Sequence, residues 1–219
     1  DLTSLSASGS SLALEAKLFH SLATGFVLSD PSQALVIMRE VLSAQPQNPL
    51  ALFFCASLAL KNSENELGLV MLNDLSRYNR GLPLYYADYL KGEGYLRKGD
   101  YLNSISSYRW FISHQAGQNF IKDAWYKIGL CYRLNGDDHD GRVHFQVARA
   151  KGKEATEADK SAARNLSEND LPNIELLQVR YLTDGGYYLQ AAEILAGLSA
   201  AELVSKKEQV ELYYRRARL

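Results

Sequence analysis

Apolar side chains recur along this chain with the spacing of an amphipathic helix. Within the segment from Asp123 to Arg149, one such set lies at positions i, i+3, i+4 and i+7, namely Trp125, Ile128, Gly129 and Tyr132. This spacing places the four residues on one face of a helix. No stretch shows the two-residue alternation of a half-buried strand. The pattern therefore predicts an all-α protein.

The same segment also contains a turn and a second helix. Glycine inside a helix costs about 1 kcal/mol relative to alanine, so Gly129 predicts another helix passing too close for a side chain. Gly136 and Asp137 follow, with glycine suited to the left-handed end of one helix and aspartate to the N-cap of the next. We expect Phe145 and Ala148 to face back toward the first helix.

This unit repeats along the chain. Residues 37 positions earlier occupy the equivalent places, namely Gly92, Tyr95, Gly99, Asp100 and Tyr108. A degenerate copy without the Gly-Asp pair precedes them, with Phe53, Ala56, Leu60 and Leu69 around a turn at Asn62 to Asn65. Further upstream, Asp30 to Pro49 predicts another second helix, after a first helix at roughly Leu14 to Leu28. A period in the thirties predicts a solenoid, in which each unit buries its apolar faces against its neighbours.

Trp, Ile, Gly, Tyr, Gly-Asp, Phe and Ala, in this order and at these intervals, resemble the tetratricopeptide repeat. The resemblance implies a right-handed α-α superhelix of helical hairpins. We interpret residues 1–11 as a polar lead-in and residues 12–219 as a single repeat domain. Its repeats are placed at about 14–47, 48–80, 84–117, 121–151 and 172–204, with an extra helix at 154–170 and a half repeat at 206–219.

The extra helix follows from the spacing of the units. The step from the central unit to the next turn and second helix, Asp184 to Leu195, is about 15 residues too long. The surplus is Ala-rich and charged, with Thr156 as a candidate N-cap and Asp159 in the first turn. Pro172 is then expected to start the next helix. Lys206 to Leu219 predicts a first helix without a partner, so we expect the chain to be a piece of a longer protein.

The resemblance also predicts a binding surface, because first helices of tetratricopeptide repeats line a concave groove. The groove-facing residues are then Phe54, Leu58, Tyr86, Tyr89, Glu93, Arg97, Tyr126, Leu130, Arg133 and Arg180, with Lys61 and Leu176 continuing the line. Tyrosine and arginine often dominate interface energy, since they bury a large area at a low ordering cost. The alternative is that these tyrosines are ordinary packing residues of the helices.

Two further features refine this prediction. Some members of the repeat class hold C-terminal carboxylates through a lysine and asparagine clamp, and the matching places here hold Tyr89, Glu93, Tyr126 and Leu130. That function is therefore not implied. Trp110 occupies a second-helix place that is usually polar and solvent-facing, so it is a candidate contact with a neighbouring domain or partner, although scattered exposed aromatics are common.

Composition agrees with one helical domain and excludes several partner classes. The chain has 219 residues, is 47% hydrophobic and has a formal net charge of −1, which argues against a nucleic-acid scaffold. We interpret Arg215, Arg216 and Arg218 as a solvated helix end. No apolar run approaches the roughly 20 residues of a membrane span. Cys55 and Cys131 lie two repeats apart, so we expect buried thiols rather than a disulfide.

Candidate chemistry is sparse. His139 and His144 are five residues apart, which does not align two metal ligands on a helix, and His20 and His114 lie in other units. The acidic stretch Asn135 to Gly141 lacks the carboxylate and glutamate positions of a calcium loop. No catalytic arrangement follows from residue order. The sequence therefore predicts a non-enzymatic protein with no cofactor and no metal.

From about Asn48 onward, the runs GQNFIKDAWYKIGLCYRLNGD, EADKSAARN and LLQVRYLTDGGYYLQAAEIL resemble uncharacterised bacterial tetratricopeptide proteins. Those proteins are distantly similar to the tetratricopeptide repeat protein 39 and Iml2 family. The resemblance implies a bacterial, periplasmic or envelope-associated origin rather than a cytoplasmic one. The leading hypothesis is a scaffold that binds a protein or peptide in its groove. The alternatives are a groove that binds a small apolar ligand such as a lipid, and a structural module of a larger protein.

Overall fold

The computed structural model describes residues 11–79, 81–167 and 172–219, and the regular structure throughout these ranges is helical. The predicted all-α fold is thereby confirmed. The lead-in predicted at residues 1–11 lies outside the described residues except for Ser11. The α-helices are α2 (Ser11–Leu22), α3 (Pro31–Ala44), α4 (Pro49–Lys61), α5 (Asn65–Tyr78), α6 (Tyr86–Lys98), α7 (Tyr101–His114), α8 (Ile121–Leu134), α9 (Asp138–Ala150), α10 (Glu157–Leu166), α11 (Ile174–Asp184), α12 (Tyr188–Gly197) and α13 (Lys206–Arg218).

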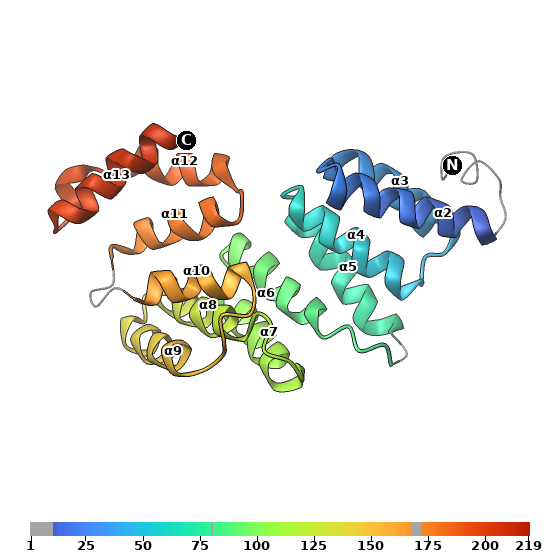
Figure 1. The fold of residues 1–219 in the computed structure, drawn as a ribbon, viewed down its shortest axis with the longest axis horizontal. Helices are drawn as coiled ribbons and strands as arrows, with labels where there is room; N and C mark the ends of the chain where they lie inside the picture. The colour runs from blue at the N-terminus through green and yellow to red at the C-terminus, as the bar shows by residue number, and fades with distance from the viewer. Residues whose placement is uncertain (1–10, 80, 168–171) are drawn as a thin grey trace. The chain divides into compact units, whose positions relative to one another are not determined.

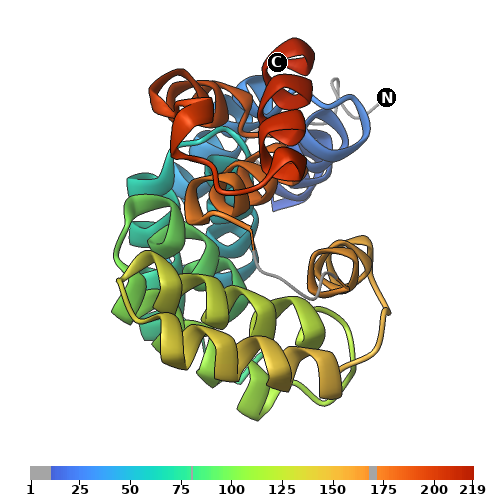
Figure 2. The same ribbon diagram turned by 90° about the vertical axis from the view of Figure 1, so that its left-hand side faces the viewer.

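The chain divides into two compact units, Asp1–Gln115 and Ala116–Leu219. In the first unit, α2 packs on α3, α4 on α5 and α6 on α7, and α4 also contacts α6 (Figure 1). In the second unit, α8 pairs with α9 and α11 with α12, as Figure 2 shows for α8 and α9. The remaining helices of this unit pack on these pairs, α10 on α8 and α13 on α12. A single continuous repeat domain over both units stays a prediction.

The Gly-Asp turns adopt the predicted conformation. Gly99 and Gly136 are in the left-handed region, with φ of 77° and 86°. Asp100 and Asp137 then cap α7 and α9, each accepting a hydrogen bond from the backbone N–H three residues on, at 3.3 and 2.9 Å. These bonds satisfy an N–H group that the first helical turn leaves without a partner.

The degenerate turn shows what replaces the Gly-Asp pair. Ser63 takes the left-handed position, with φ of 62°, although it is not glycine. Glu64, at the N-cap of α5, makes no side-chain capping bond. The hairpin of α4 and α5 therefore turns without the Gly-Asp pair, and the side chain of Asn62 donates a hydrogen bond of 2.8 Å to Glu64 within this turn.

Close helix packing confirms the predicted role of the mid-helix glycines. A Cβ atom added at Gly129 would lie 2.7 Å from Cδ1 of Phe145, and one at Gly92 would lie 2.6 Å from Cε1 of Tyr108. Phe145 and Ala148 are buried, as their spacing predicted. In these two hairpins, the first helix thus lies directly against an aromatic ring of the second helix.

Two predicted helix boundaries need correction. The first helix does not run regularly to Leu28: α2 ends at Leu22 and a π-helical turn follows at Ala23–Val27, which brings Gly25 into contact with Leu58. Pro172 does not start α11, because the side chain of Asn173 accepts hydrogen bonds from the N–H groups of Glu175 and Leu176, at 2.9 and 3.2 Å, and so caps a helix that begins at Ile174.

Candidate protein-binding face

The least buried residues of α4 form one stripe along the helix. Apart from Pro49 at the start of the helix, they are Leu50, Phe53, Phe54, Ser57 and Lys61, and their spacing places them on a single helical face. The opposite side of α4 is buried and includes Ala51, Cys55 and Leu58. The stripe is therefore the part of α4 that a partner can contact.

The rings of this stripe continue onto α6. Phe53 lies edge-on to Phe54 and to Tyr86, with ring centroids 5.2 and 6.5 Å apart. Tyr86 stacks on Tyr89 at 5.1 Å with an interplanar angle of 14°. Phe53, Phe54 and Tyr86 are half-buried. We call these three residues the aromatic face.

A buried layer supports the aromatic face from below. Tyr89 is buried and lies edge-on to Tyr108 and Phe111, at 5.6 and 5.4 Å between centroids. Tyr108 donates a hydrogen bond of 2.6 Å to Oε1 of Glu93, which is also buried. Such edge-on and stacked ring pairs contribute about 0.5–1.5 kcal/mol each beyond their buried area. The face is thus held in one arrangement before any partner binds.

Two cations near the C-terminal ends of α4 and α6 bind backbone carbonyl groups. Arg97 donates to the carbonyl oxygens of Leu60 and Glu93, at 2.8 and 3.1 Å. Lys61 donates to the carbonyl oxygen of Gly25 at 3.1 Å and lies over the ring of Phe26. Because helix C-termini carry unpaired carbonyls and partial negative charge, these cations stabilise the ends of neighbouring helices.

In the second unit, α10 covers the start of α8. The carboxylate of Asp159 accepts hydrogen bonds from the backbone N–H groups of Phe120 and Asp123, at 2.9 and 3.0 Å. It also accepts from the N–H and hydroxyl of Thr156, at 3.1 and 2.7 Å, within the capping box of α10. Thr156 therefore caps α10 as predicted. One fully buried carboxylate thus serves the N-termini of two helices.

The predicted groove residues of α8 lie beneath neighbouring helices. Tyr126 and Leu130 are buried. The hydroxyl of Tyr126 has no hydrogen-bond partner among the described residues, and burial raises its pKa. Next to it, Lys127 forms an ion pair of 2.7 Å with Asp123 and lies over the ring of Tyr181. The α8 surface therefore packs inside the second unit.

The two remaining arginines also make contacts within the second unit. Arg133 donates to Asp138 at 2.9 Å and to the carbonyl oxygen of Pro172 at 3.1 Å. Arg180 donates to both carboxylate oxygens of Glu211, at 2.7 and 2.5 Å. The paired geometry of the second contact joins α11 to α13.

The ten predicted groove residues thus fall into two groups. Phe54, Tyr86 and Arg97 are half-buried, so part of each side chain is accessible, and Arg133 is of intermediate burial with only 9% of its side chain exposed. The other six are buried, which differs from the expected accessible groove, because adjacent helices and buried rings cover them: Leu58, Tyr89, Glu93, Tyr126, Leu130 and Arg180. The binding role of all ten stays a prediction.

Sequence reasoning missed Phe53 as a member of the face. The repeat pattern assigns Phe53 to the place of Trp125, which packs between helices. In the structure its ring contacts Tyr86 and is half-buried. The signal that could have found it is the stripe that continues from Leu50 through Ser57 to Lys61. This spacing assigns Phe53 and Phe54 to the same face.

Trp110 is exposed, and it stacks on His114. Its exposed fraction is 57%, and the two ring centroids are 4.1 Å apart. His114 lies in turn 6.3 Å from the ring of Tyr85. A partner for this tryptophan stays a prediction.

The described residues contain buried thiols and few other reactive groups. Cys55 and Cys131 are both buried and neither forms a disulfide within the described residues, as predicted, and burial raises the pKa of Cys55 to about 11. Within the described ranges, three or more histidine, cysteine or acidic residues do not gather at a place that could hold a metal ion. None of the helices described is both long and apolar enough to cross a membrane.

Two solved structures resemble this chain in fold. The first, described as the crystal structure of MamA protein, has 19% sequence identity and a TM-score of 0.56, and the match covers 69% of this chain and 75% of that one. The second, described as the MamA RS-1 ArsTM double mutant, has 13% identity and the same TM-score of 0.56, and the match covers 92% of this chain and 94% of that one.

These likenesses, together with the helical hairpins, show the fold. This chain is a tetratricopeptide-like helical repeat. No protein-family model matches the sequence. No curated protein matches it either.

Proposed function

We propose that this chain is a non-enzymatic scaffold that binds a protein or peptide segment at the aromatic face. The observation that carries the proposal is the fixed arrangement of Phe53, Phe54 and Tyr86, half-buried on two adjacent first helices and supported by the buried Tyr89. Large rings that are already ordered lose little conformational freedom on binding, so their contacts contribute efficiently to affinity.

The proposal gives the predicted groove residues different parts. Tyr86 and Phe54 contact the partner directly, together with Phe53. Tyr89 and Glu93 position these rings from below, through the buried ring contacts and the hydrogen bond from Tyr108. A contribution of Tyr126, Leu130, Arg133 and Arg180 to binding, all within the second unit, remains a separate part of the proposal.

The test is affinity capture with a matched pair of variants. Tyr86→Glu places a charge on the aromatic face, whereas Val70→Glu places the same charge at a half-exposed position on α5, a second helix. We expect a partner retained by wild type and by Val70→Glu to be lost from Tyr86→Glu, with circular dichroism showing all three chains folded. Equal retention by both variants would refute the aromatic face as the binding surface.

A small apolar ligand such as a lipid is the second candidate, since the same rings would bind it. Organic extraction and mass spectrometry of the purified protein separate the two. A stoichiometric lipid that Tyr86→Glu releases would favour this alternative. A blank extract, with a protein retained in the capture, would favour the scaffold.

We also infer from the sequence a kinship with uncharacterised bacterial tetratricopeptide proteins and, more distantly, with the tetratricopeptide repeat protein 39 and Iml2 family. A periplasmic or envelope-associated location and a role as one module of a larger protein belong to the same inference. The genomic sequence on both sides of this segment tests the kinship, the location and the role as one module of a larger protein.

A further inference from the structure

Helix α13 carries an exposed apolar stripe. It consists of Val210, Tyr213, Tyr214 and Ala217, whose spacing of i, i+3, i+4 and i+7 places them on one helical face. The first three are 67%, 59% and 57% exposed. The buried Leu212 lies on the other side of the helix, and α13 packs on α12. We call the four exposed residues the α13 stripe.

Cations lie at both ends of the α13 stripe. The helix contains five lysine and arginine residues and two glutamates, which gives it a net charge of +3. Lys206 is exposed one turn before Val210, on the same face. Arg218 is also exposed, and it donates a hydrogen bond of 3.2 Å to the hydroxyl of Tyr214.

Both glutamates of α13 bind groups of their own unit. Glu208 accepts a hydrogen bond of 2.7 Å from the backbone N–H of Asn173, so the start of α11 lies against the side of α13 opposite to the stripe. Glu211 accepts hydrogen bonds from Arg180 at 2.7 and 2.5 Å and from Arg215 at 2.8 Å. The carboxylates that α13 itself supplies are therefore occupied by contacts other than the cations at the ends of the stripe.

The spacing along α13 favours a helix as the partner. Lys206, Val210, Tyr213 and Ala217 follow the alternating steps of four and three residues by which one helix packs along another. Val210 and Ala217 are small enough for a second helix to approach closely. A membrane surface instead favours helices with a broad face of larger apolar side chains such as Trp, Phe and Leu.

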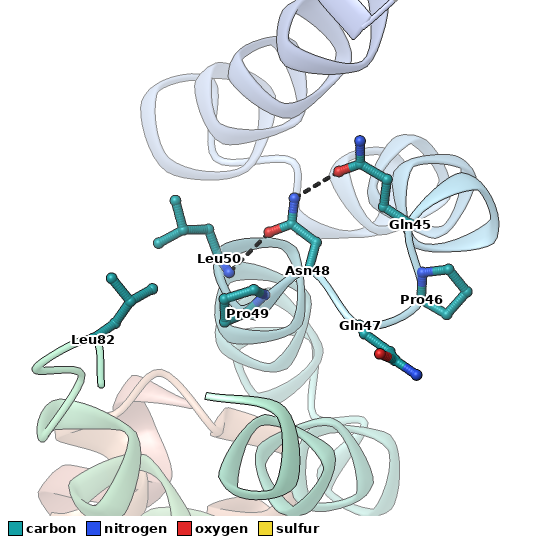
Figure 3. Close-up of a pocket in the computed structure, with 7 residues that line it drawn as sticks. All are labelled: Gln45, Pro46, Gln47, Asn48, Pro49, Leu50 and Leu82. Atoms are coloured by element: carbon teal, nitrogen blue, oxygen red, sulfur yellow. Dashed lines mark hydrogen bonds between the residues drawn. The ribbon is translucent and has the colours of Figure 1, made fainter. Parts of the chain in front are cut away.

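Charge distinguishes the α13 stripe from the open pocket of the first unit. That pocket is lined by residues from Gln45 to Leu50 and by Leu82 (Figure 3). These described lining residues are uncharged, so they select no class of partner by charge. At the α13 stripe, by contrast, exposed cations next to apolar side chains favour a partner that is both apolar and acidic.

We propose that the α13 stripe binds an amphipathic helix of a partner protein, with acidic residues on both sides of its apolar face. The apolar face packs along Val210, Tyr213 and Ala217, and the acidic residues pair with Lys206 and Arg218. The α13 stripe belongs to the second unit and the aromatic face to the first, so the proposal does not depend on the aromatic face.

The test is calorimetric titration of the chain with two blocked peptides of three heptads each. The acidic peptide is (Leu-Ala-Ala-Leu-Glu-Gln-Glu)₃, and the control has lysine in place of each glutamate. Like charges on both sides of the leucines oppose pairing of either peptide with itself. We expect the acidic peptide to bind roughly tenfold more tightly or better, and to weaken several-fold as salt rises from about 50 to 300 mM. Because the whole chain has a net charge of −1, non-specific attraction would not favour the acidic peptide. Equal binding of the two peptides, or no binding of the acidic one, would overturn the proposal.

A matched pair of variants locates the binding. Val210→Glu, in the α13 stripe, should weaken the acidic peptide roughly tenfold or more, whereas Val204→Glu, at an exposed position just before α13, should bind it like wild type. The double variant Lys206→Glu, Arg218→Glu should prefer the basic peptide. Circular dichroism checks that each variant is folded. If folded Val210→Glu binds as wild type does, or if the double variant keeps the original preference, the α13 stripe is not the site.

Two other occupants of the α13 stripe would give different results. Binding of the chain to vesicles of phosphatidylcholine and phosphatidylglycerol that Val210→Glu abolishes would assign the stripe to a membrane surface. A wild-type dimer in analytical ultracentrifugation that Val210→Glu dissociates would assign it to a second copy of the chain. Either result would overturn the proposal of an acidic partner helix.

Discussion

The close approach of α8 and α9 depends on one missing side chain, at Gly129. An added Cβ would lie 2.7 Å from Cδ1 of Phe145 and 3.0 Å from the carbonyl oxygen of Gly141. The ring is buried and the carbonyl belongs to a helix, so neither neighbour can move cheaply. At this residue the close packing of the two helices favours glycine, although glycine has a lower helix propensity than alanine.

We expect Gly129→Ala to destabilise the protein by about 1–2 kcal/mol. Alanine gains about 1 kcal/mol of helix propensity, but a Cβ at 2.7 Å from a buried ring overpacks the core at the upper end of the usual cost, about 2–3 kcal/mol. Gly197→Ala is the matched control, because a Cβ there meets no atom within 4 Å. Urea unfolding should show Gly197→Ala unchanged or slightly more stable. A neutral Gly129→Ala would mean that the two helices separate easily.

At the scale of elements, α10 is attached through the carboxylate of Asp159, which accepts hydrogen bonds from Phe120, Asp123 and Thr156. Asp159→Asn keeps the shape but turns an NH₂ group toward these donors. We expect a loss of about 1–3 kcal/mol, since buried donors are left unsatisfied. Hydrogen–deuterium exchange at Phe120 and Asp123 should accelerate. Glu154→Gln also removes one negative charge, at an exposed position just before α10. This control should alter neither the stability nor the exchange rates.

The attachment of α13 should depend on pH through Glu211. Burial alone would raise the pKa of this carboxyl, but hydrogen bonds from Arg180 and Arg215 outweigh it and hold the pKa below its ordinary value of 4.5. A carboxylate whose pKa is lowered by folding contributes stability above its unfolded pKa and loses it as the pH falls through the folded value. Stability should therefore decline as the pH falls below about 4.5.

Glu211→Gln measures this contribution. The variant should be less stable than wild type at pH 7, and the difference between the two should shrink as the pH is lowered to about 2. Glu193→Gln, an exposed change on α12, controls for the loss of one charge. A difference from wild type that is constant with pH would contradict a role for the charged form of Glu211.

For the whole molecule, the division into two compact units predicts that a destabilising substitution in one unit affects mainly that unit. Phe145→Leu, in the core of α8 and α9, should cost about 1–2 kcal/mol. Stability in repeat proteins is approximately a sum of local and nearest-neighbour terms. We therefore expect faster hydrogen–deuterium exchange in α8 and α9, with little change in α4 and α5. Equal acceleration throughout the chain would show one cooperative unit.

How far the sequence predicts this molecule depends on the range of each interaction. The N-caps at Asp100 and Asp137 and the packing of Gly129 could be predicted, because they depend on residues of one hairpin. The full burial of Tyr126 could not, because it depends on how α11 packs against α8 as well as on the contact with Phe145 of α9. The resemblance to regular repeats predicted an accessible groove there, whereas both α10 and α11 pack on α8.

The same distinction applies to the aromatic face. Spacing alone places Phe54 and Tyr86 on the first helices, but the contact between Phe53 and Tyr86 depends on the relative rotation of α4 and α6. The position of Leu82, between α5 and α6, depends on its two hydrogen bonds with the side chain of Asn79. Helical periodicity cannot predict the conformation of such an irregular connection.

The two buried cysteines give each unit its own chemical reporter of opening. Thiols react as thiolates, and burial raises the pKa of Cys55 to about 11, so this thiol forms little thiolate while it stays buried. Alkylation should therefore require that the surrounding helices open, and its rate should follow the population of the open form. Mass spectrometry distinguishes modification at Cys55 from modification at Cys131. One reaction on the wild-type chain would therefore measure the opening of the first and the second unit separately.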